Sequence, residues 1–394
     1  MTLQSKRDEP IGSIILNLFT SDIISSVRDV YKLALKQDIF LHIYGYHGRE
    51  PHSAVNYIWD ADTMQRYGGE LMPKFIKSLC YSGMAKREEQ IVDPEERTFE
   101  WVLDRNQRGS HRSLSFRKWL YSGDGVFWIS GNPGSGKSTL MKYLHGKVTS
   151  ALNNGHDNRI INRPEAYWRN FGANYRRILA NFYFWSCGFR LQRTVDGLLR
   201  SLLAQILREV PELIPAISPS RCEAILLFGE DPKPFSIIEL RQMFLALIHN
   251  IEAHAIMYLF IDGLDEAGDG LNEVLDLLQE IRLFSNIKLC VASRQTSEIE
   301  FAFGNDPGLQ LHDLIRDDIY IYVERKLGPA VRSSIDGADI SDATRIVDMV
   351  VEKSFGVFLW VNLAVREVME RCQIQDATYI STCALSRQRL AGDY

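Results

Sequence analysis

The residues best suited to chemistry in this chain stand in a short glycine-rich segment, positions 131–139. The segment satisfies the pattern GxxxxGK[ST], in which glycines let the backbone turn so tightly that successive N–H groups point inward and form a nest for an anion. Lys137 has the charge and reach to contact the β- and γ-phosphates of a nucleotide, and the Ser138 hydroxyl suits Mg²⁺. The predicted phosphate-binding residues are Gly131, Asn132, Pro133, Gly134, Ser135, Gly136, Lys137, Ser138 and Thr139.

An acidic group follows an apolar run further along the chain. Residues 256–261 read as a buried strand, and Asp262 comes directly after them. An Asp at the carboxyl end of a parallel strand faces the crevice where open α/β sheets bind ligands, so we expect Asp262 and Ser138 to hold Mg²⁺. Asp265 or Glu266, just beyond, is expected to polarise an attacking water. The simpler interpretation is an acidic turn at the surface.

A third apolar run, residues 287–292, ends in Ser293 and Arg294. A basic side chain at this position is expected to sense the γ-phosphate or to position water. Arg294 could equally cap the strand end or pair with a nearby carboxylate, and the sequence does not decide between these roles.

These residues need a sheet that brings the ends of several strands together. Apolar runs alternate with helical patterns, which is typical of a parallel sheet covered by helices on both faces. The sequence therefore predicts an α/β fold, with helices alone beyond position 317. The predicted strands are residues 126–129, 181–185, 256–261, 287–292 and 309–311. The predicted helices are residues 98–103, 115–120, 139–148, 195–210, 237–251, 271–284, 319–327, 342–354 and 357–371.

Composition limits the remaining function classes. The 394 residues carry a net charge of -5, and this acidic balance argues against a dedicated nucleic-acid binder. The six cysteines are scattered without a CxxC pair, which favours a reducing compartment over a disulfide framework. The longest apolar run is far shorter than the roughly 20 residues of a membrane span, and the first residues show no secretory signal. We therefore expect a cytoplasmic protein without a membrane span.

Two further patterns have an ordinary explanation. His42, His47 and His52 recur at even intervals, but that spacing fits neither one helix face nor one strand face, so a metal site is not expected. Arginines alternate with aromatic residues over positions 159–177, which could indicate stacking on RNA. A solvated helical insertion explains this segment more simply.

Several segments in this order resemble the NACHT family of signal-transduction NTPases, in the form abundant in filamentous fungi. The matching segments are TFEWVL (98–103), FWISGNPGSGKSTLMKYL (127–144), NFYFW (181–185), GLLRSLLAQIL (197–207), LFIDGLDE (259–266), IKLCVASR (287–294), LQLHDLIRDDIYIYV (309–323) and GVFLWVNLAV (356–365). The resemblance implies an ASCE-type P-loop NTPase core with a helical subdomain that binds ATP or GTP with Mg²⁺. It further implies a switch in self/non-self recognition or programmed cell death, which assembles with itself or with paralogous NLR-like proteins.

The chain also departs from this family. Gln295 follows Arg294 where the family has Pro, and the helical subdomain is followed by no segment that resembles a winged helix or repeats. The predicted division is a mostly helical N-terminal region without an assigned function (1–95), the NTPase core (96–322) and a partial helical subdomain with a dissimilar tail (323–394). A truncated adaptor or decoy that scaffolds paralogues without a nucleotide cycle is the main alternative to a switch, and a metabolic NTPase is a third.

Overall fold

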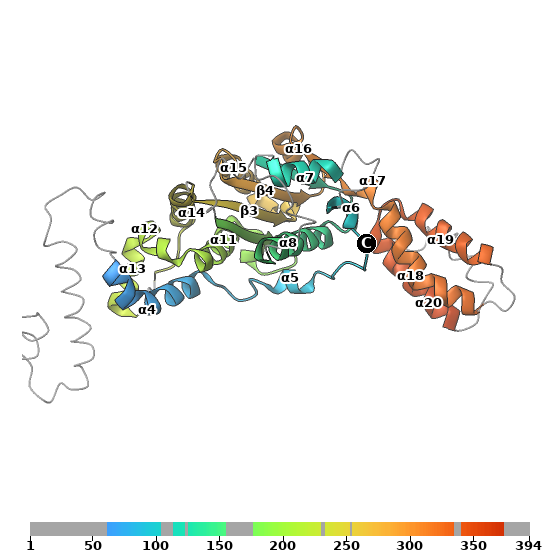
Figure 1. Cartoon of the computed structure of the whole chain (residues 1–394), viewed down its shortest axis with the longest axis horizontal. Helices are drawn as coiled ribbons and strands as arrows, with labels where there is room; N and C mark the ends of the chain where they lie inside the picture. The colour runs from blue at the N-terminus through green and yellow to red at the C-terminus, as the bar shows by residue number, and fades with distance from the viewer. Residues whose placement is uncertain are drawn as a thin grey trace, which may run out of the picture. The chain divides into compact units, whose positions relative to one another are not determined.

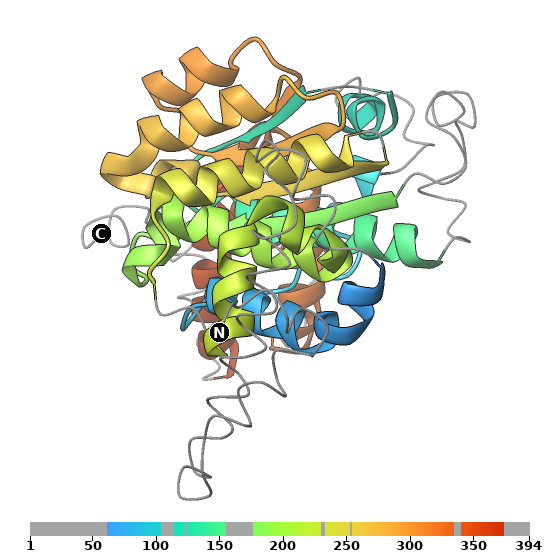
Figure 2. The same ribbon diagram turned by 90° about the vertical axis from the view of Figure 1, so that its left-hand side faces the viewer.

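The computed structural model describes residues 61–103, 113–122, 125–154, 176–229, 233–252, 254–334 and 340–373, and Figures 1 and 2 show their elements from two directions. Within these residues the chain forms two compact units. One unit contains residues 61–82 and Leu199–Ile251, and the other contains Gly83–Leu198 and the residues from Glu252 onward. The three-part division predicted from the sequence stays a prediction.

The second unit is built on a parallel sheet, which confirms the predicted α/β class. Its strands in the described residues are β1 (Gly125–Ser130), β2 (Arg176–Tyr183), β3 (Ala255–Asp262), β4 (Ile287–Ser293) and β5 (Gly308–Gln310). They follow the order β2-β3-β4-β1-β5, and all pairings are parallel. The order places β4 between β1 and β3, so the two strands that lead into the glycine segment and into Asp262 are not neighbours.

Both faces of the sheet are buried, which explains why its central strands read as unbroken apolar runs. Every residue of β3 and of β4 is buried. Alternate residues of neighbouring strands, such as Phe127, Phe260 and Cys290, face one core that also contains the apolar side of α8 (Lys137–Asn154). In Figure 1, α8 lies below β3 and β4, and α15 (Leu271–Ile281) lies above them.

Shorter helices and a helical group complete this unit. Helices α18 (Arg316–Ser334), α19 (Ile340–Ser354) and α20 (Phe358–Gln373) pack against one another, and Val323, Val347 and Val361 belong to the same core as α8. The other elements are α5 (Lys86–Gln90), α6 (Glu100–Leu103), α7 (Ser113–Ser122), η3 (Arg190–Arg193), η5 (Leu264–Gly270), α16 (Ser297–Phe303) and α17 (Leu311–Leu314).

The first unit is helical in its described residues. It contains α4 (Ala61–Leu79), most of α11 (Val195–Glu209), η4 (Pro211–Leu213), α12 (Ile214–Ile217), α13 (Pro219–Phe228) and α14 (Ile237–Ile251). A buried arginine, Arg221, holds α13 to α14. Its guanidinium donates to the Glu239 carboxylate at 2.8 Å and lies 3.6 Å from the centre of the Phe235 ring.

Most predicted elements are present, with one clear error. Strand β2 was predicted over residues 181–185, but it runs from Arg176 to Tyr183. The chain leaves the sheet at Trp185, whose N–H donates to the carbonyl of Gln192 in the following turn. Arg176 and Arg177 therefore belong to the strand and not to an insertion. No helix in the described parts of the chain combines the length and the apolar character that a membrane span requires.

Candidate functional site

The glycine segment forms a tight loop between β1 and α8, the strand–loop–helix context that its pattern requires. Gly134 has φ 71° and Gly136 has φ 92°, conformations that side-chain-bearing residues adopt only at a cost. The Ser135 N–H donates to the Asn132 carbonyl at 3.2 Å, and the Leu140 N–H donates to the Gly136 carbonyl at 2.9 Å. Residues 131–136 therefore wind into the first turn of the helix, and we refer to them as the phosphate loop.

Lys137 lies against this loop. Its ammonium donates to the carbonyls of Gly131 at 2.7 Å and Asn132 at 3.0 Å. Burial lowers the pKa of Lys137, and the nearby Asp265 and Asp262 carboxylates oppose that shift. The positive charge is thus held at the mouth of the loop by acceptors that a phosphate oxygen could replace.

The structure brings Ser138 and Asp262 together, as the sequence predicts for two Mg²⁺ ligands. Asp262 ends β3, where the register sets it opposite Tyr183 and Ala292, and its side chain is buried. Burial raises the pKa of Asp262 to about 6, although a hydrogen bond with the Ser138 side chain and the charges of Arg87 and Lys137 work in the other direction.

The other predicted acidic and basic residues pair with close neighbours. The Asp265 carboxylate accepts from the backbone N–H of Arg294 at 2.8 Å, and its second oxygen lies 3.1 Å from the Arg294 Nε. The Glu266 carboxylate accepts from the Ser186 N–H at 2.8 Å and from the Ser186 hydroxyl at 3.1 Å. Arg294 thus makes the carboxylate pairing that the sequence left open, and its role as a phosphate sensor stays a prediction.

The chemistry of these groups fits a nucleotide with Mg²⁺. A hydroxyl and a carboxylate oxygen are the ligands that Mg²⁺ prefers, and the loop supplies N–H groups and an ammonium for phosphates. The Ser135 hydroxyl is buried without a hydrogen-bond partner among the described residues. A Cβ at Gly131 would lie only 2.8 Å from that hydroxyl, so position 131 has no room for a side chain.

A contact between the phosphate loop and α20 was not predicted. The Leu359 N–H, in the first turn of α20, donates to the Gly134 carbonyl at 2.9 Å. A Cβ at Gly134 would lie 2.9 Å from the Leu359 Cβ and 3.4 Å from Val357. Residues 356–365 are among the segments that resemble the NACHT family, which marks them as a candidate functional segment. Nothing in their local sequence predicts that they pack on the phosphate loop.

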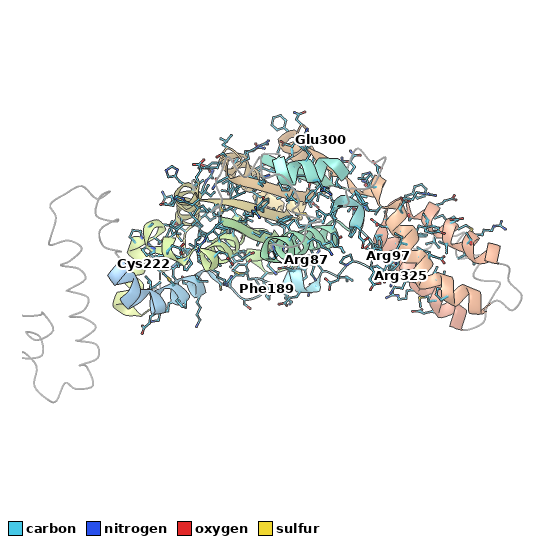
Figure 3. The ribbon with its side chains drawn as sticks, in the orientation of Figure 1. Arg87, Arg97, Phe189, Cys222, Glu300 and Arg325 are labelled. Carbon is cyan, nitrogen blue, oxygen red and sulfur yellow. The ribbon has the colours of Figure 1, made fainter. Side chains whose placement is uncertain are left out.

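Residues 98–101 also pack beside the phosphate loop, a contact that was not predicted from the sequence. Phe99 packs on Tyr143 of α8, and its ring lies 3.7 Å from the place of a Cβ on Gly136. Asp318 of α18 accepts from the Phe99 N–H at 3.0 Å and from the Trp101 Nε1 at 2.7 Å. Arg325, labelled in Figure 3, extends this connection by pairing with Glu96 at 3.1 Å.

Two of the weaker sequence patterns cannot be placed. His42, His47 and His52 lie outside the described residues, as do the arginines and aromatic residues of positions 159–175. In the part of the chain that the structure describes, no three His, Cys, Asp or Glu residues gather in a way that could hold a metal ion.

Two comparisons relate this chain to known proteins. The sequence model described as "Nephrocystin 3, N-terminal" matches residues 97–294, which is half of the chain. A solved structure, "Structure of Drosophila ORC bound to DNA", matches at 12% identity with a TM-score of 0.36, over 70% of this chain and 66% of that chain. No curated protein matches. By the extent of its match, the chain belongs to the nephrocystin 3 N-terminal family.

Proposed function

We propose that the chain binds a nucleoside triphosphate, ATP or GTP, with Mg²⁺ at residues 131–139 and uses it as a slow molecular switch. The observation that carries this proposal is the tightly wound phosphate loop, with the Lys137 ammonium on its carbonyls and the buried Asp262 at the carboxyl edge of the same sheet. In this arrangement Lys137 and the loop N–H groups hold the phosphates, and Ser138 and Asp262 hold the metal ion. Bound Mg²⁺ would neutralise charge on the phosphate oxygens.

Slow hydrolysis follows from how the acidic residues are held. A residue that polarises an attacking water needs an available carboxylate oxygen in the right place. Asp265 is engaged by Arg294 through both of its oxygens, and Glu266 accepts from Ser186 through one oxygen. Asp265 has to exchange its partner before it can act, and Glu266 is held in place by Ser186, so we expect bound triphosphate to persist.

The contact between Leu359 and Gly134 supports a switch in preference to simple storage of nucleotide. A phosphate loop that changes shape on binding moves the acceptor of the Leu359 N–H, and with it the start of α20. On the strength of the resemblance to NACHT proteins, we propose that this signal serves self/non-self recognition or programmed cell death in the cytoplasm. The partners would be further copies of the chain or paralogous NLR-like proteins.

Nucleotide binding by a Lys137→Ala variant tests the proposal. Wild-type protein should bind MgATP or MgGTP by calorimetry, and the variant should lose about 10- to 100-fold in affinity, because a hydrogen bond from a charged donor contributes about 1.5–3 kcal/mol. Lys147→Ala is the matched control. Lys147 lies on the same helix, exposed and over the Tyr143 ring, so its removal should leave affinity unchanged.

The same experiment separates the alternatives. Absence of nucleotide binding by the folded wild-type protein would overturn the proposed function. Association with paralogues that is equal in wild type, Lys137→Ala and Asp262→Ala would favour an adaptor without a nucleotide cycle. Rapid multiple-turnover hydrolysis would favour a metabolic NTPase.

A further inference from the structure

Helix α5 carries a basic residue, Arg87, to the edge of the candidate site. Several contacts fix this short helix against β2, α8 and the turn after β2. The Glu88 carboxylate accepts from the Asn181 amide at 2.9 Å, and the Ile91 carbonyl accepts from Lys142 at 2.8 Å. The Lys86 ammonium lies 5.5 Å from the centre of the Phe189 ring, and Figure 3 shows Phe189 and Arg87 close to α5.

The Arg87 side chain has an unmet donor. Its guanidinium carbon lies 5.9 Å from the centre of the Trp185 ring, which holds the group beside the end of β2. Its Nε is buried and has no hydrogen-bond partner among the described residues. A buried N–H without an acceptor is destabilising, so such a group in a folded protein calls for an explanation.

Arg87 lies at the same end of the sheet as the predicted metal ligand. The Phe184 N–H donates to the Asp262 carbonyl at 2.9 Å, and the next residue, Trp185, carries the ring beside the Arg87 guanidinium. The other basic groups of the site are already engaged, since Lys137 donates to loop carbonyls and Arg294 pairs with Asp265. Arg87 therefore brings a cation to Asp262 from the side of β2.

We propose that Arg87 is a ligand of the terminal phosphate of the bound nucleotide, supplied by the same chain. This inference rests on the proposed function. A planar guanidinium suits phosphate oxygens, which would give the Arg87 Nε the acceptor that it lacks. Asp262 would hold the Mg²⁺ that neutralises the terminal phosphates, so a cation on the same side of the site would reach the terminal phosphate. Arg87 would thus make the site discriminate triphosphate from diphosphate.

Affinities for a non-hydrolysable ATP analogue and for ADP, each with Mg²⁺, test this role in the full chain. Arg87→Gln should weaken binding of the analogue by about tenfold or more, as for the loss of a charge-assisted hydrogen bond, and leave ADP affinity nearly unchanged. Arg87→Lys should show a smaller loss in the same direction, because it keeps the charge without the planar fork. Lys86→Gln, on the same helix, should leave the ratio of the two affinities at the wild-type value.

Each outcome of these measurements either supports the role of Arg87 or overturns it. Equal weakening of analogue and ADP in Arg87→Gln, or an unchanged ratio in both Arg87 variants, would show a structural arginine and overturn the inference while the proposed function stands. If Arg87→Gln does not fold, as judged by thermal denaturation, the affinity ratio of Arg87→Lys decides in its place. If the wild-type protein binds no adenine nucleotide, a GTP analogue and GDP are compared in the same way. If it binds neither pair, the proposed function fails and this inference fails with it.

Discussion

Asp318 shows how one buried carboxylate can join two segments. It is almost fully buried, at 1% exposure, and its two oxygens accept from the Phe99 N–H and from the Trp101 ring nitrogen. Burial raises the pKa of Asp318 to about 6, and the neighbouring charges of Asp317 and Glu100 add to the shift. Both donors are neutral, so no cation compensates the carboxylate in these two hydrogen bonds.

This carboxylate should make stability depend on pH. Because its folded-state pKa lies above the ordinary value near 4, the folded protein holds the proton more tightly, and the stabilisation is complete below about pH 4 and lost as pH rises through about 6. The loss should be on the order of 1–3 kcal/mol. In Asp318→Asn this part of the slope should disappear. Asp262 contributes in the same direction, so a smaller slope remains.

Urea denaturation between pH 4 and pH 7 measures the effect. Asparagine keeps one acceptor oxygen and leaves one donor without its partner, a cost that does not vary with pH. The variant should therefore be less stable than the wild type at pH 4, and the difference should shrink as pH rises because the variant has the flatter profile. Parallel profiles for the two proteins would contradict the expectation.

Single residues could be predicted from sequence where their partners are local. Lys137 and Ser138 follow the loop by fixed spacing, and Asp262 directly follows an apolar strand. Asp265 with Arg294, and Asp318 with Trp101, come from separate parts of the chain and meet only after the sheet and helices have packed. The spacing of apolar residues carries no information on such pairs. The sequence therefore could not decide whether Arg294 senses a phosphate or pairs with a carboxylate.

At the scale of elements, the turn between α19 and α20 is the most constrained. Gly356 has φ 72°, and a Cβ there would lie within van der Waals overlap of the His312 carbonyl of α17. The turn must therefore fit closely over α17 for α20 to begin where Leu359 meets the phosphate loop. Only a glycine satisfies both the backbone conformation and the space.

Gly356→Ala should destabilise the protein through both effects. The left-handed conformation costs alanine about 1–2 kcal/mol, and the overlap with a backbone carbonyl should add about 1–3 kcal/mol. Gly229→Ala is the matched control, because Gly229 has φ 82° but no atom within 4 Å of its Cβ position. Urea denaturation should show the larger loss for Gly356→Ala. Equal losses for the two variants would show that the close approach to α17 has no energetic effect.

Elements were predictable where burial leaves a simple pattern. Strands β3 and β4 are buried on both faces and read as apolar runs, whereas β2 begins with two arginines and was placed too late. Helix α4 falls in the region predicted to be mostly helical, but its bounds were not predicted, because its charged and apolar residues mix with Gly68, Gly69 and Pro73. Helix α5 has no buried residue to give it a pattern.

At the scale of the whole molecule, every group of the candidate site belongs to one of the two compact units. The phosphate loop, Asp262, Arg294, Arg87 and Leu359 all lie in the unit that contains the sheet. Residues 199–251 belong to the other unit, although they lie in sequence between β2 and β3. Ligand binding should therefore affect the two units unequally.

Hydrogen exchange with and without MgATP measures this difference. Amides of the phosphate loop, of residues 262–266 and of Leu359 should exchange more slowly with nucleotide, since binding stabilises the state that holds these hydrogen bonds. Amides of α14 and α13 should be unaffected. Protection of equal size in α14 would contradict the expectation, and Lys137→Ala serves as the control that should show no protection.

The way in which the chain passes between the two units has a consequence for biosynthesis. A ribosome delivers α4 early, but the helices that α4 packs with are translated only after β2 has emerged. The sheet in turn waits for β3 and β4, which follow α14. A nascent chain that ends near residue 198 has therefore completed neither unit, and its apolar strands stay exposed to aggregation until translation has passed β4. We therefore expect the nascent chain to be most prone to aggregation during this interval.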